Sequence, residues 1–183
     1  LNEAAYAACS AQKNSAEIVG LLLDNGVNCN LEMHQSETPC LLFHNACAWG
    51  NIEVAKLLLE RGVDVNSKEN QRGIYSLDDN ALHIIVTQIH NNRAKRHLHP
   101  HVNLSNDTKS TDILNSIDNI ADEKYLCLIH FLISKGADFY HKASDYDCTP
   151  KELARILELH DIVEILETAE QENTASYSSF FSE

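Results

Sequence analysis

An apolar segment recurs four times along the chain, three times closed by a glycine, and this repetition constrains the fold more than any other feature of the sequence. The copies are residues 14–30 (NSAEIVGLLLDNGVNCN), 43–66 (FHNACAWGNIEVAKLLLERGVDVN), 126–140 (LCLIHFLISKGADFY) and 145–167 (DYDCTPKELARILELHDIVEILE). Gly26 and Gly62 are 36 residues apart, and Gly62 and Gly136 are 74 apart, which is two periods plus a small excess. Such a period is typical of a solenoid, in which each unit buries its apolar face only against its neighbours.

The apolar residues of each copy predict helices. Val54, Leu57 and Leu58 recur at the spacing i, i+3, i+4, which is the stripe of a helix with one buried face. The glycine that follows, Gly62 in this copy, suits the left-handed conformation that ends a helix. An earlier segment offers small side chains such as Ala46, so that a neighbouring helix can approach closely. Each copy is therefore expected to be a pair of helices.

The motifs resemble the ankyrin repeat, whose signature is Thr-Pro-Leu-His-x-Ala. TPKELA at 149–154, FHNACAWGN at 43–51 and LLLERGVDVN at 57–66 carry the resemblance, which extends to about residue 170. In the third copy Asn80-Ala81-Leu82-His83 stands in place of Thr-Pro-Leu-His. The resemblance implies an all-α solenoid of about four helix-turn-helix repeats with short β-hairpin fingers, and partners of such arrays usually meet the fingers and the inner helices.

The expected domain organisation has one irregularity, an insertion between the two helices of the third repeat. The units are repeat 1 (1–36), repeat 2 (37–72), repeat 3 (73–142) with an insertion at about 91–120, repeat 4 as the C-terminal cap (143–170) and a flexible tail (171–183). A solenoid tolerates such an insertion as a loop on one face. A flexible polar loop and a small basic contact through RAKRHLHPH remain alternatives for it.

Three histidines in the insertion raise the question of a metal site. His97, His99 and His101 alternate, so that on an extended strand they would share one face. Pro100 interrupts them, however, and no cysteine or carboxylate lies close by to complete a set of four zinc ligands. We therefore expect no metal and no cofactor.

Composition excludes several function classes. The net charge of −13 over 183 residues argues against a general affinity for nucleic acid or for anionic membranes. No run of 18 apolar residues predicts a membrane span. The six cysteines form no CxxC pair and lie mostly in apolar stretches, which favours free thiols in a reducing compartment. We expect a monomer in the cytoplasm, or in the host cytosol or nucleus if the protein is a secreted effector; a start at Leu1 rather than methionine is expected of a fragment.

No enzymatic motif is present in the sequence: it contains no glycine-rich phosphate loop, no HExxH and no GxSxG. His44 and Cys47 suggest a thiol–imidazole pair, but the resemblance implies that His44 bonds backbone between repeats and that Cys47 occupies a small buried position. We therefore expect a non-catalytic scaffold or adaptor that binds a partner protein through the concave groove and the finger tips. The alternative is a targeting or substrate-recruitment module of a larger enzyme, possibly a bacterial effector acting in a host cell.

The expected contact residues centre on Trp49, the single tryptophan, which is either an exposed interface residue or packed on the next repeat. The full set is Ala48, Trp49, Arg72, Tyr75, Thr87, Gln88, Tyr146 and Ile156. Acidic residues that include Glu69 and Asp79 are expected to surround them at the surface, which favours a partner with a basic or mixed patch. The resemblance also marks Asn30 and Asn66, which end two fingers, as candidate substrates of an asparaginyl hydroxylase.

Overall fold

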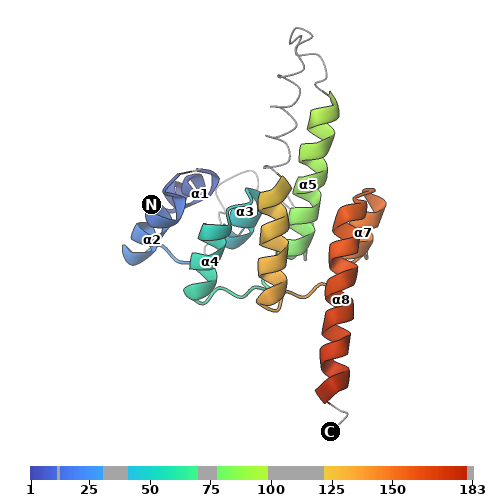
Figure 1. Ribbon diagram of the computed structural model, residues 1–183. Coiled ribbons are helices and arrows are strands. Elements are labelled where there is room, and N and C mark those ends of the chain that lie inside the picture. The colour runs from blue at the N-terminus through green and yellow to red at the C-terminus, as the bar shows by residue number, and fades with distance from the viewer. Residues whose placement is uncertain (12, 31–40, 70–77, 99–121, 181–183) are drawn as a thin grey trace.

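The computed structural model describes residues 1–11, 13–30, 41–69, 78–98 and 122–180, and every described regular element is a helix. The helices are α1 (Asn2–Ser10), α2 (Ser15–Asp24), α3 (Leu42–Ala48), α4 (Ile52–Glu60), α5 (Ala81–Leu98), a helix that includes residues 122–134, α7 (Pro150–Ile156) and α8 (His160–Phe180). Figure 1 shows them following one another across the molecule from the N-terminus to the C-terminus.

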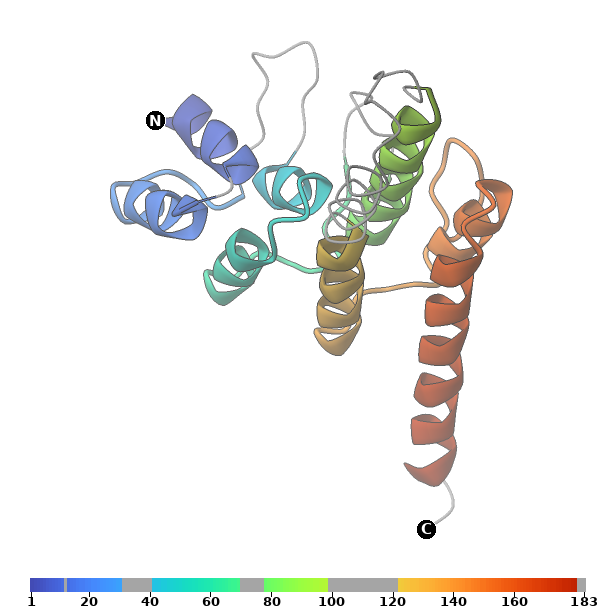
Figure 2. The same cartoon turned by 45° about the horizontal axis from the view of Figure 1, so that its top comes forward.

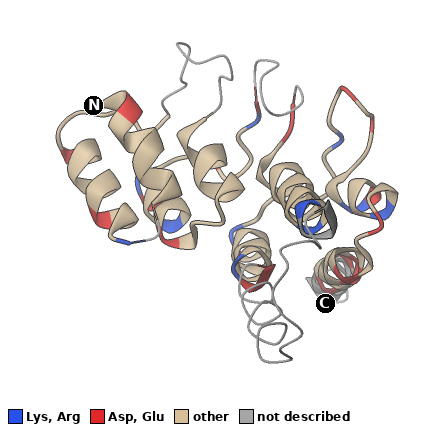
Figure 3. Ribbon diagram, turned by 90° about the horizontal axis from the view of Figure 1, so that it is seen from above, with Lys and Arg blue, Asp and Glu red and all other residues tan. Residues whose placement is uncertain are grey.

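The helices form an inner row and an outer row. In the inner row α1 packs on α3, α3 on α5 and α5 on α7, while α2 packs on α4 in the outer row. Within the pairs, α1 contacts α2, α3 contacts α4 and α7 contacts α8, and Figures 2 and 3 show the pairs side by side. This arrangement confirms the all-α solenoid expected from the repeat.

The expected β-hairpin fingers contain isolated β-bridges and no regular strands in the described part of the chain. Single antiparallel bridges join Lys68 to Asn80 and Ala143 to Cys148, and no longer ladder occurs in the described part of the chain. Backbone hydrogen bonds from Glu69 N to Asp79 O (3.0 Å) and from Asp78 N to Glu69 O (2.9 Å) close the first of these fingers. Among the described residues, each of these two fingers is therefore closed by a single bridge.

The apolar stripes of the outer helices build the core. Fully buried residues occur at equivalent positions of three helices, namely Val54, Leu58, Leu128, Leu132, Ile162 and Leu166. Burying a leucine or isoleucine side chain contributes roughly 1.5–3 kcal/mol. In α2 the equivalent Ile18 is 41% exposed; among the described helices, α2 contacts α1 of its own pair and α4 of the next pair.

Glycine decides where the outer helices end. Gly62 and Gly136 have φ angles of 89° and 83°, in the left-handed region that closes a helix without steric cost. Gly136 stands four residues after Leu132, whereas Glu170 stands four residues after Leu166, and α8 continues to Phe180. Residues 171–180 are thus helical, although the sequence led us to expect a flexible tail from residue 171.

The first helix of the third pair also runs further than expected. α5 continues to Leu98, so residues 91–98 of the expected insertion are helical, and residues 99–121 lie outside the described residues. The stretch NNRAKRHL contains good helix formers and no glycine, and the next proline after it is Pro100. Arg93 fixes it, because its guanidinium bonds Asp122 at 2.9 Å and Asp161 at 2.6 and 2.8 Å. In Figure 1, α5 and α8 project from the body in opposite directions.

Candidate protein-binding face and the buried histidines

Trp49, the residue after α3, presents its side chain to solvent. It is 52% exposed, so it is not packed into the next repeat. Its backbone is held: the carbonyl oxygen of Trp49 accepts a hydrogen bond from Lys124 Nζ at 2.7 Å, and burial lowers the pKa of that ammonium. The neighbouring Ala48 is 8% exposed, and its carbonyl oxygen accepts from the Tyr125 hydroxyl at 2.8 Å. Ala48 is therefore unavailable to a partner, contrary to the expectation from sequence.

The other expected contact residues are accessible to different degrees. Ile156, at the end of α7, is 67% exposed, while Thr87 and Gln88 on α5 are half-buried. Since α3, α5 and α7 pack in sequence, Trp49, Thr87, Gln88 and Ile156 all belong to the inner row. The half-buried Tyr146 donates its hydroxyl to the Asp79 carboxylate in the preceding finger. Arg72 and Tyr75 lie outside the described residues.

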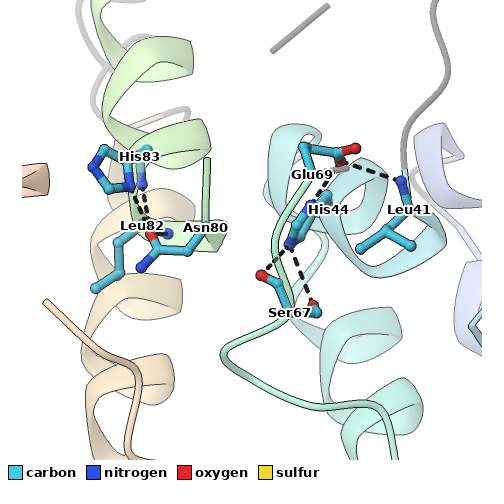
Figure 4. Close-up of polar contacts among 7 residues, drawn as sticks. All are labelled: Leu41, His44, Ser67, Glu69, Asn80, Leu82 and His83. Atoms are coloured by element: carbon cyan, nitrogen blue, oxygen red, sulfur yellow. Dashed lines mark hydrogen bonds and ion pairs between the residues drawn. The ribbon is translucent and has the colours of Figure 1, made fainter. Parts of the chain in front are cut away.

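His44 is fully buried and joins α3 to the following finger (Figure 4). Its Nε2 lies 3.0 Å from the Ser67 carbonyl oxygen, which can only accept, so this nitrogen donates. Its Nδ1 lies 2.6 Å from Glu69 Oε1, and the same oxygen accepts from the Leu41 backbone N–H at 3.2 Å. The bond to Ser67 confirms the role expected for His44, whereas Glu69 was not predicted as its second partner.

His83 occupies the equivalent position in α5 and is also buried (Figure 4). Its Nδ1 lies 2.9 Å from Asn80 Oδ1 and its Nε2 lies 3.0 Å from the Cys148 carbonyl oxygen. Asn80 Oδ1 also accepts from the backbone N–H groups of Leu82 and His83, which caps the start of α5. Burial lowers the pKa of His83 to about 4, although the Cys148 carbonyl favours the charged ring. Asparagine thus replaces the threonine of the Thr-Pro-Leu-His pattern in its capping role.

Two acidic residues expected at the surface are buried instead. Glu69 is 3% exposed and Asp79 is 2% exposed, and they hold His44 and Tyr146 respectively. Spacing within one repeat could not reveal either pairing, because Glu69 lies 25 residues after His44 and Asp79 lies 67 residues before Tyr146. Both carboxylates therefore connect a finger to its surroundings and take no part in an acidic surface.

The two finger asparagines differ in their surroundings. Asn66 is half-buried; its Nδ2 donates to the Gly136 carbonyl oxygen at 3.1 Å, and its Oδ1 accepts from Asp138 N at 2.7 Å. Asn30 is exposed, and its backbone N–H donates to Asn28 Oδ1 at 3.0 Å. Asn66 thus fastens the next finger, whereas Asn30 presents its side chain at the surface.

Cofactor and thiol chemistry find little support among the described residues. No group of three His, Cys, Asp or Glu side chains in those ranges is placed to hold a metal ion. His99 and His101 lie outside them, and the side chain of His97 is not described. No helix in the described ranges is long and apolar enough to cross a membrane. Cys47, the candidate thiol, is fully buried. Both nitrogens of the His44 ring already face Glu69 and Ser67, and a buried thiol is poorly reactive.

Comparison with known proteins agrees with this geometry. A family model described as "Ankyrin repeats (3 copies)" matches residues 2–69. No curated protein matches the chain. The matched segment contains α1 to α4, His44 and Glu69, and the helix pairs that follow continue the same two rows. Residues 2–69 of the chain are therefore similar to ankyrin repeats.

Proposed function

We propose that the chain is a non-catalytic scaffold or adaptor, which binds a partner protein along its inner helix row with Trp49 at the centre. Ankyrin repeats are generally protein–protein interaction modules and are typically non-catalytic. The observation that carries the proposal is the exposure of Trp49 and Ile156, two large apolar side chains on successive parts of one row. Tryptophan is the residue type most enriched where interface energy concentrates.

A truncation of Trp49 tests this surface. Trp49→Ala is expected to weaken binding of the cognate partner by about 2 kcal/mol, roughly 30-fold, without changing the unfolding transition. Leu21→Ala is the matched control, because Leu21 is an exposed apolar residue on α2, in the outer row. A partner captured from lysate by the wild type and by Leu21→Ala, but lost with Trp49→Ala, would then be titrated by calorimetry. Equal affinities of all three proteins would remove Trp49 from the interface.

We further propose a monomer that functions in the reducing cytoplasm. Cys9, Cys47 and Cys148 are buried as small core residues. Burial raises the pKa of the Cys9 thiol to about 12, so that this thiol does not form the reactive thiolate at neutral pH. These three cysteines thus contribute to packing, which agrees with a compartment where thiols remain reduced.

Hydroxylation, if it occurs, is proposed to take place at Asn30 rather than Asn66. Modification of Asn66 requires that its amide first leave the backbone groups of Gly136 and Asp138, whereas Asn30 is exposed. Treatment with an asparaginyl hydroxylase is expected to add one oxygen atom to the intact mass of the wild type and of Asn66→Ala, and none to Asn30→Ala. An added oxygen in Asn30→Ala would contradict this order of preference.

A further inference from the structure

The continuation of α8 creates a cleft that lies away from the inner row. Glu170 stands at the position where the other outer helices have their closing glycine, but α8 continues past it to Phe180. This continuation lies beside residues 136–140. Ala169, Glu172 and Asn173 line a cavity of about 410 Å³ together with the finger residues from Gly136 to Tyr140. A second cavity of about 440 Å³ lies between α8 and the helix that includes residues 122–134. The two cavities share Ile133, Ala169 and Glu172, so they lie next to each other along α8 and are called the cleft together.

An aromatic side chain stands at one end of this cleft. Tyr140 follows Gly136 at the same spacing at which Asn66 follows Gly62, 74 residues earlier. At that equivalent position the Asn66 side chain bonds the backbone of Gly136 in the next repeat. Tyr140 lines the first cavity together with Ala169, Glu172 and Asn173 of α8, and its side chain is 52% exposed. Its ring packs on Phe139, with 4.6 Å between the ring centroids. The exposed ring therefore offers a contact face at the opening of the cleft.

The floor and the edge of the cleft differ in character. Ile133, Ile165 and Ala169 provide an apolar floor, while Asp138, Glu164 and Glu172 contribute carboxylates. Among the described residues, neither cavity is lined by a lysine or an arginine. An apolar floor with carboxylates around it and an aromatic ring at one end complements a chain that alternates basic and apolar side chains.

We propose that this cleft is a second binding surface, which takes a basic segment of a partner protein. An apolar side chain of the segment covers Ile133 and Ile165, and its guanidinium or ammonium groups lie against Asp138, Glu164 and the ring of Tyr140. From Glu164 to Glu172 α8 rises roughly 12 Å, the length of about four residues of extended chain. The overall charge of −13 favours the approach of such a segment.

Binding of a short peptide tests the proposal. The probe is acetyl-Arg-Leu-Arg-Leu-Arg-amide, and its counterpart has glutamate in place of arginine. The basic peptide is expected to cause saturable shifts of the Tyr140, Ile165 and Ala169 amides in the ¹⁵N–¹H spectrum, while the acidic peptide causes none. Tyr140→Ala and Glu164→Gln are each expected to weaken binding about fivefold, since both side chains are exposed and their replacement leaves the core intact.

Two control variants separate this surface from general charge attraction and from the inner row. Glu17→Gln removes the same charge from an exposed site on α2, and Trp49→Ala alters the inner row. Both are expected to bind the basic peptide as the wild type does. The proposal is overturned if no saturable shift occurs at the cleft, or if Glu17→Gln weakens binding as much as Glu164→Gln.

Discussion

Replacing Glu69 by alanine is expected to lower the free energy of unfolding by about 3–5 kcal/mol, the range found when one partner of a buried pair is removed. The carboxylate is buried, lies 2.6 Å from His44 Nδ1 and accepts the Leu41 N–H at 3.2 Å. Both groups lose their partner in the variant, and water does not replace it at a fully buried ring. Urea unfolding measured at constant slope m gives the change as a shift of the midpoint.

Three further variants identify the cause of that loss. Glu69→Gln keeps an oxygen for the Leu41 N–H and is expected to lose less than Glu69→Ala. Glu53→Ala breaks an exposed ion pair with Lys56 on α4 and is expected to cost under about 0.5 kcal/mol. His44→Leu combined with Glu69→Ala is expected to recover part of the loss, because no buried ring nitrogen is then left without its carboxylate partner. A cost below about 1 kcal/mol for Glu69→Ala would show that the pair does not hold the finger.

The helix pairs were predictable because their signal is local. Positions such as Val54 and Leu58 bury one face at helical spacing, and each pair meets only its neighbours, so the stripe alone places them in the core. The ends of α5 and α8 were predicted less well. Both run on because no glycine or proline interrupts them, and Arg93 reaches partners 29 and 68 residues away. Such contacts depend on the assembled fold, which no pattern within one repeat reveals.

In the candidate site, too, contacts between distant residues could not be predicted from local sequence patterns. The exposure of Trp49 belongs to a repeat position for which the sequence left two alternatives, an exposed side chain or one packed on the next repeat. The burial of Ala48 depends on Tyr125, 77 residues away, and the burial of Glu69 depends on His44 in another element. A small residue and a carboxylate in a finger are both ordinary surface residues in sequence terms. Their actual roles arise from contacts between repeats, as does the cleft beside Tyr140.

Acidification from pH 7 to pH 4 is expected to destabilise the wild type through His83. The ring is buried beside His141, and burial lowers the pKa of His83 from 6.5 to about 4, with His141 acting in the same direction and Asp138 opposing it. In the unfolded chain the ring takes up a proton near pH 6.5, whereas in the folded chain it stays neutral until about pH 4. Protons thus favour the unfolded state in this window, and the stability present above pH 6.5 falls by up to about 3 kcal/mol.

Comparison with His83→Gln isolates this effect. Glutamine keeps a donor for the Cys148 carbonyl but does not titrate, while Asp161, whose pKa is lowered by Arg93, contributes to the acid sensitivity of both proteins. The free energy of unfolding of the wild type is therefore expected to fall by about 3 kcal/mol more than that of the variant between pH 7 and pH 4. A wild type that gained stability relative to His83→Gln on acidification would contradict this prediction. If Asn80 Oδ1 and the Cys148 carbonyl, each about 3 Å from a ring nitrogen, outweighed burial, the folded ring would bind the proton and the wild type would gain stability relative to the variant.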